Sequence, residues 1–111
     1  MSVKIGEIGK QIFVGTGFDM SNNTELGIKF VSPDESIEFT RLSADGVTAP
    51  GVPSPDLPNI GVLAANEYLL YETQALDFTV AGDWCINAEY TEGTTKFFIG
   101  DNGTLTISDT C

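Results

Sequence analysis

The side chains of this chain that could carry out chemistry are mostly carboxylates. Sixteen Asp and Glu residues stand against five Lys and Arg residues, and the formal net charge is −11 at pH 7. The chain contains no histidine, which excludes a histidine general base and a histidine-ligated zinc site. Glycosidases act through paired carboxylates, but the spacing of the acids here singles out no pair. We therefore predict that the chain has no catalytic residue and is not an enzyme.

Two short polar segments have the residue types of a cation site. Asp101-Asn102-Gly103 is similar to a fragment of a calcium-binding loop, but the remaining ligand positions do not follow it. We interpret this segment as a hairpin turn. Asp19 with Asn22 and Asn23 offers oxygen atoms for weak cation binding, which stays open as an alternative to a plain turn. We predict no cofactor and no metal.

The two cysteines, Cys85 and Cys111, match no zinc or redox motif. If Thr91 pairs with Thr94 across a turn at 92–93, Cys111 lies at the far end of the sheet from Cys85. Six residues at about 3.3 Å each separate the two cysteines, or roughly 20 Å. A disulfide needs Cα atoms within about 7 Å, so we predict no Cys85–Cys111 bond.

The acidic charge restricts the partners that the chain can bind. It repels a phosphate backbone and an anionic membrane surface, and it attracts a basic protein. The sequence has no apolar run as long as a membrane span and no signal-peptide core after Met1. We expect a protein made and used without export, with no nucleic-acid, membrane or small-molecule partner.

Alternating apolar and polar residues indicate half-buried strands along most of the chain. Apolar faces recur in 24–31 (Leu26, Ile28, Phe30), in 37–41 and in 83–91. The length of 111 residues fits one domain, 1–111. About seven or eight antiparallel strands, with turn signals every 8–12 residues, predict an all-β, two-sheet immunoglobulin-like sandwich. A small barrel is the alternative. The predicted core anchors are Phe30, Phe39, Trp84, Ile86 and Tyr90.

Two segments are predicted to contact neighbouring molecules. The first, 1–14, reads as an edge strand that Gly6 and Gly9 kink. The second is a Pro-rich loop at 43–62, for which the prolines predict an extended, polyproline-like path with few ladder donors. The interface candidates are Ile12, Phe13, Pro50, Pro53, Pro55, Pro58 and Phe97.

Three segments in this order carry a family resemblance: the Ser32-Pro33-Asp34 turn, the Gly82-Asp83-Trp84 strand and a final hairpin closing on 103–107. Together they resemble the immunoglobulin-like modules of tailed-bacteriophage virion proteins, nearest the amino-terminal domain of upper baseplate proteins. The resemblance implies a non-enzymatic virion structural protein that is synthesised and assembled in the host cytoplasm. It would bind other virion proteins in a multi-copy assembly at the tail, neck or baseplate, or decorate the capsid.

A second function stays open, namely a carbohydrate- or cell-surface-binding module. In that case exposed Tyr68, Tyr71, Phe97 or Phe98 would stack on sugar rings. Adjacent Phe97 and Phe98 point to opposite faces of a strand, so one of them lies outside the core.

Overall fold

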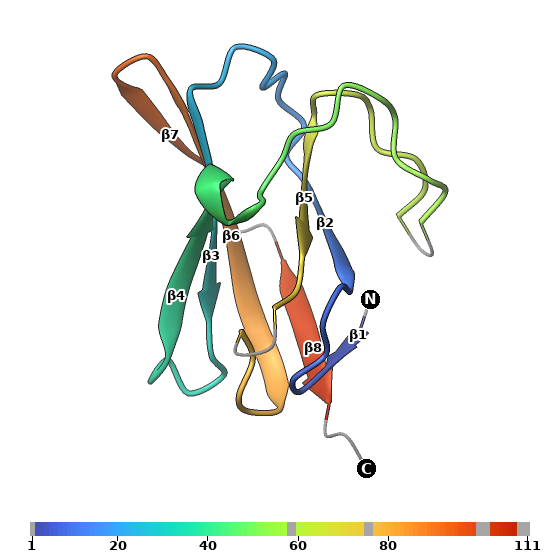
Figure 1. Cartoon of the computed structure of the whole chain (residues 1–111), viewed down its shortest axis with the longest axis vertical. Helices are drawn as coiled ribbons and strands as arrows, with labels where there is room; N and C mark the ends of the chain where they lie inside the picture. Colours follow the sequence, from blue (N-terminus) through green and yellow to red (C-terminus); the bar gives the residue numbers. More distant parts are fainter. Residues whose placement is uncertain (1, 58–59, 75–76, 100–102, 109–111) are drawn as a thin grey trace.

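The structure, a computed structural model, describes residues 2–57, 60–74, 77–99 and 103–108, and these fold as an all-β protein (Figure 1). One 3-10 turn, η1 (Ser43–Asp45), accompanies the strands. Within the described residues no helix is long and apolar enough to span a membrane. The strands are β1 (Ser2–Lys4), β2 (Gln11–Gly15), β3 (Glu25–Val31), β4 (Glu38–Leu42), β5 (Tyr68–Glu72), β6 (Gly82–Glu92), β7 (Thr95–Ile99) and β8 (Thr104–Ser108).

The strands form two sheets of unequal size. The larger sheet has the order β1-β8-β6-β3-β4, with β7 also paired to β6, and the smaller sheet contains β2 and β5. Every pair is antiparallel except β1 with β8, which is parallel. The prediction of purely antiparallel strands is therefore wrong for β1.

The predicted kinked edge strand over 1–14 is two strands that belong to different sheets. Gly6 and Gly9 have φ values of 76° and 80°, which lie in the left-handed region that glycine adopts without steric cost. Between them the chain leaves β8, where Ile5 N–H donates to the Ser108 carbonyl at 3.0 Å. It then reaches the residue that follows β5, where Gly9 N–H donates to the Thr73 carbonyl at 2.8 Å.

Strands β7 and β8 lie along the same edge of β6, one after the other. Thr91 pairs with Lys96 and Glu92 with Thr95, so the hairpin turn is at 93–94 and the predicted turn at 92–93 is wrong by one residue. Cys85 consequently lies opposite Thr104 of β8. Its thiol is free and exposed. Cys111 lies outside the described residues, so the absence of a disulfide stays a prediction.

The core lies between the sheets and is centred on aromatic rings. Trp84 is completely buried, and its Nε1–H donates to the Val80 carbonyl at 3.1 Å. Phe78 meets Trp84 edge-on with ring centroids 5.2 Å apart, and it meets Phe30 in the same way at 5.3 Å. Of the predicted core anchors, Phe30 and Trp84 are completely buried, Ile86 and Tyr90 are buried, and Phe39 is half-buried.

We predict that Trp84→Ala lowers the free energy of unfolding by about 3–5 kcal/mol, because it leaves a cavity among the packed rings. Phe18→Ala is the control, since the Phe18 side chain is 55% exposed. We expect that change to cost less than about 0.5 kcal/mol. Urea denaturation of both variants measures the difference, and equal stabilities would contradict the core position of Trp84.

Candidate functional site

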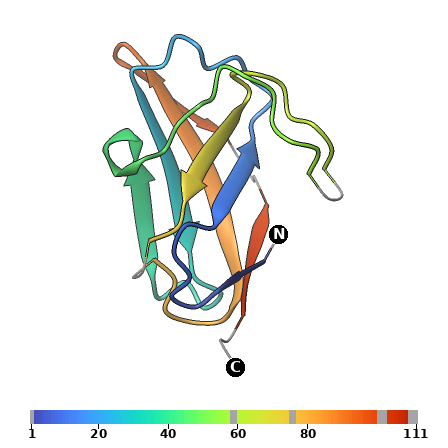
Figure 2. The same cartoon turned by 45° about the vertical axis from the view of Figure 1, so that its right-hand side comes forward.

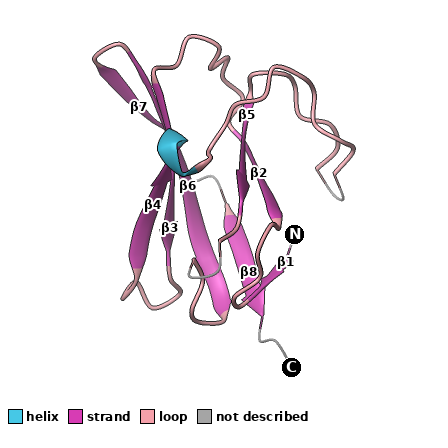
Figure 3. Cartoon of the chain, viewed as in Figure 1, coloured by secondary structure: helices cyan, strands magenta, loops and turns pink. Residues whose placement is uncertain are grey.

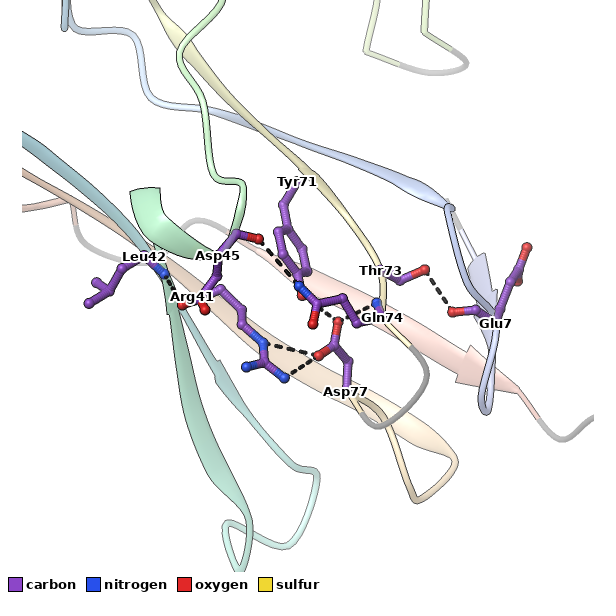
Figure 4. A network of polar contacts seen from close by, with 8 residues as sticks. All are labelled: Glu7, Arg41, Leu42, Asp45, Tyr71, Thr73, Gln74 and Asp77. Carbon is purple, nitrogen blue, oxygen red and sulfur yellow. Dashed lines mark hydrogen bonds and ion pairs between the residues drawn. The ribbon is translucent and has the colours of Figure 1, made fainter.

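The most elaborate polar cluster of the described residues surrounds the buried carboxylate of Asp77 (Figure 4). Arg41 of β4 donates to Oδ1 through Nε at 3.0 Å and also through Nη2. The Tyr71 hydroxyl and the Gln74 backbone N–H donate to Oδ2 at 2.5 and 2.8 Å. The cluster thus joins β4 of the larger sheet to β5 of the smaller sheet.

The chemistry of this cluster indicates a structural role, in which it links the two sheets. Burial raises the pKa of Tyr71, and donation of its hydroxyl to Asp77 raises that pKa further. Tyr71 therefore keeps its proton and acts as a fixed donor at neutral pH. Because both Asp77 oxygens are occupied by protein donors, we assign the cluster to holding the sheets together.

A second feature, the outer groove, lies on the outer face of the small sheet. It consists of two adjoining hollows of about 510 and 440 Å³. Ile8, Gly9 and Glu72 line both hollows. Phe13 of β2 lines the first hollow and Leu70 of β5 the second, and these two residues pair across the sheet.

Residues 50–66 are here called the arm, and its described part projects away from the small sheet of β2 and β5 (Figures 1 and 2). Figure 3 draws the described residues of the arm as loop. Backbone hydrogen bonds close the arm on itself: Ser54 N–H donates to the Leu63 carbonyl and Leu57 N–H to the Gly61 carbonyl, each at 2.9 Å. The predicted extended, polyproline-like path is thus wrong for this segment, because it folds back instead of running straight across.

Exposed apolar side chains gather on the arm and at the groove. Ile8 exposes 72% of its surface, and Val52, Ile60 and Val62 of the arm expose 63%, 55% and 60%. Ile60 and Leu57 also line the first hollow of the groove. None of these four exposed residues was named as an interface candidate from the sequence, although all four lie in the segments 1–14 and 43–62 that were predicted to contact neighbours. The sequence did contain an indication of their exposure, because these large apolar residues lie in Gly- and Pro-rich segments, where no strand buries them.

The structure separates the predicted interface residues. Ile12 is completely buried, so its side chain is not offered to a partner, whereas Phe13 faces the outer groove. Adjacent residues of a strand point to opposite faces, so only one of the two can face outward. Pro53 and Pro55 are exposed and Pro50 is half-buried at the base of the arm. Pro58 and the side chain of Phe97 lie outside the described part of the chain.

Two of the four aromatic residues proposed to stack on sugar rings are buried. Tyr68 and Tyr71 are only 2% and 1% exposed. The Tyr68 hydroxyl donates to the Val52 carbonyl under the arm at 3.0 Å, and Tyr71 donates to Asp77. The side chains of Phe97 and Phe98 lie outside the described part of the chain.

In the segment of Asp19, Asn22 and Asn23, the side chains of Asp19 and Asn23 form hydrogen bonds within the loop. Asp19 Oδ1 accepts from Ser21 N–H at 3.0 Å, and this hydrogen bonding lowers the pKa of Asp19. Asn23 Nδ2 donates to the Met20 carbonyl at 2.7 Å. Among the residues with described positions, no group of three or more Asp, Glu or Cys side chains could hold a metal ion. Asp101 and Asn102 lie outside that part.

We predict that Asp77→Asn destabilises the fold by about 3 kcal/mol. The amide places a donor against donors, and it leaves the Arg41 charge without its partner. Glu38→Gln is the matched control, because the Lys29–Glu38 ion pair is exposed and worth less than about 1 kcal/mol. Chemical denaturation at pH 7 measures the free energy of unfolding of the two variants. Equally small losses of stability would contradict the structural role of the Asp77 cluster.

Tyr71→Phe tests the raised pKa of Tyr71. A folded-state pKa above the unfolded value of about 10 gives stability that is complete below pH 10 and is lost as the pH rises. We therefore expect wild type to be more stable than Tyr71→Phe at pH 8, with the gap narrowing above pH 10. Unfolding free energies at pH 8 to 11 measure the gap, and a constant gap would contradict the raised pKa.

The chain stands apart in comparisons with known proteins. No protein-family model, no curated protein and no solved structure matches it. The features that bear on its function are therefore the arm, the outer groove and the charge.

Proposed function

We propose that this chain is a non-catalytic protein-binding domain and that the arm and the outer groove are its binding surface. One observation carries the proposal: Ile8 and Ile60 line the groove and are more than half exposed, and two further apolar side chains of the arm are exposed to the same extent. Large apolar side chains that gather at one exposed site are typical of surfaces that a partner covers.

The charge supports a particular kind of partner. Sixteen acidic residues against five basic ones give the chain a net negative charge. Such a charge favours association with a basic partner and disfavours an acidic one. We propose that the partner presents apolar side chains flanked by Lys or Arg.

The strand order supports an immunoglobulin-like topology for the domain. In variable-type immunoglobulin domains, strands B and E lie in one sheet and strands C, C′, F and G in the other. The same arrangement follows if β2 and β5 are strands B and E. Strands β3, β4, β6 and β8 then take the places of C, C′, F and G.

We further propose, from the resemblance of the Ser32-Pro33-Asp34 turn and the Gly82-Asp83-Trp84 strand, that the domain is a structural protein of a tailed-phage virion. Its neighbours would be other virion proteins in the tail, neck or baseplate, or the capsid that it decorates. A domain with a projecting apolar arm suits repeated attachment to a symmetric scaffold.

The proposed place of the chain in a virion is tested by quantifying the chain in particles purified from the source that produces it. We expect a monomer by light scattering when the chain is isolated. In the particles we expect a fixed copy number relative to the other proteins, measured by isotope-dilution mass spectrometry. Recovery of the chain only in the particle-free fraction would contradict the virion setting.

The binding surface is tested by Ile60→Asp, which places a charge on the arm at the groove. We expect incorporation into particles to fall at least tenfold, because a buried unpaired charge is costly. Phe18→Asp is the control, since Phe18 is equally exposed but does not line the groove. Equal incorporation of the two variants would contradict the proposed surface.

A further inference from the structure

Among the described residues, strand β2 has a partner strand on one side only. The small sheet contains β2 and β5, and Figure 2 shows β5 along one edge of β2. Thr73 N–H donates to the Lys10 carbonyl at 3.0 Å, and Thr16 N–H donates to the Glu67 carbonyl at 2.9 Å. These two bonds bracket the strand and define which of its residues are bonded to β5.

Bonded and non-bonded pairs alternate along an antiparallel ladder. Since residues 10 and 16 bond to the β5 side, Ile12 and Val14 do so as well. The N–H and C=O groups of Gln11, Phe13 and Gly15 then point to the opposite, open edge. No described residue provides a hydrogen-bond partner for these backbone groups.

A second strand edge, that of β4, is protected. Strand β4 ends where Leu42 N–H donates to Asp45 Oδ2 at 2.9 Å and its carbonyl accepts from Val47 N–H at 3.3 Å. Its exposed Glu38 pairs with Lys29 at 3.1 Å. Charged side chains of this kind discourage edge pairing. Strand β2 instead contributes Phe13 to the outer groove, which Ile8 and Ile60 also line.

We propose that the open edge of β2 accepts an extended segment of a basic partner protein as an added strand. Backbone groups at 11, 13 and 15 would pair with the segment, and its alternate apolar side chains would cover Phe13 and the groove. This inference rests on the proposed protein-binding function and specifies the form of the partner.

Charge complementarity decides between possible occupants. Two acids, Glu7 and Glu72, line the first hollow with a single base, Lys10, and the whole chain carries −11. A second copy of the chain would bring the same negative charge to the edge, which opposes association. A segment with Lys or Arg between its apolar residues gains from the same field.

The test uses a capped nonapeptide of alternating lysine and valine as the probe, titrated into the full chain and followed by NMR. We expect saturable binding with the largest shifts at the amides of Gln11, Phe13 and Gly15. A glutamate-for-lysine peptide should not bind. Absence of binding by the lysine peptide, or equal binding by both peptides, overturns the inference.

Two N-methylated peptides test the edge without changing the protein. One carries methyl groups on the valine nitrogens and the other on the lysine nitrogens, so only one of them blocks the N–H groups that face β2. We expect one peptide to lose binding and the other to keep it. Equal affinity of the two would indicate contact through charge alone and would overturn strand addition.

Gln11→Pro removes one open-edge N–H without removing a bond to β5, so the fold should persist while peptide affinity falls at least tenfold. Thr40→Pro is the matched control, because the N–H of Thr40 points to the free edge of β4. Circular dichroism verifies folding of both variants. Equal peptide affinity of the two variants overturns strand addition. The protein-binding function itself would then be judged separately by the particle incorporation of Ile60→Asp.

Discussion

The small sheet of β2 and β5 depends on packing against the larger sheet. Two paired strands alone are at best marginally stable in water. Here the inner face of the pair is buried, with Ile12 and Leu69 completely enclosed. Tyr71 lies with its ring 6.0 Å from that of Phe30 in the larger sheet. The Arg41–Asp77 ion pair adds a polar tie to this apolar contact.

The packing of the small sheet against the larger one determines which of its surfaces remain available for binding a partner. The inner face is used by the core, and one edge of β2 is used by β5. The outer face and the other edge of β2 are left, and both adjoin the arm. Hydrogen bonds within the arm place its apolar side chains without help from a partner, so the surface exists before binding and its ordering cost is reduced.

Alternation along single strands made much of the fold predictable from sequence. Leu26, Ile28 and Phe30 of β3 share one face, and the structure buries all three. Contacts between distant segments were not predictable in this way. The parallel pairing of β1 rests on three residues whose partner lies about a hundred residues later, Val3 opposite Ile107. Nothing local in 1–4 encodes that pairing.

The candidate site was predictable to a smaller extent. Phe13 was named from the sequence as an interface residue, and it lines the groove. Ile12 was named as well, but adjacent residues of a strand point to opposite faces of the sheet, and Ile12 is buried in the core. Asp77 was missed because its donors come from Arg41 and Tyr71, which are far apart in the sequence. The arm was expected to be extended, because its prolines lack the N–H groups that a strand ladder needs. The prolines give no sign of the hydrogen bond between Ser54 and Leu63 that folds the arm back.

Amide hydrogen exchange, measured by NMR on the free protein, distinguishes the edge of β2 that is bonded to β5 from the edge that is open. We expect protected amides at Ile12 and Val14 and fast exchange at Gln11, Phe13 and Gly15. Equal protection of all five amides would mean that the second edge of β2 is already paired, and β2 would then have no open edge to offer a partner.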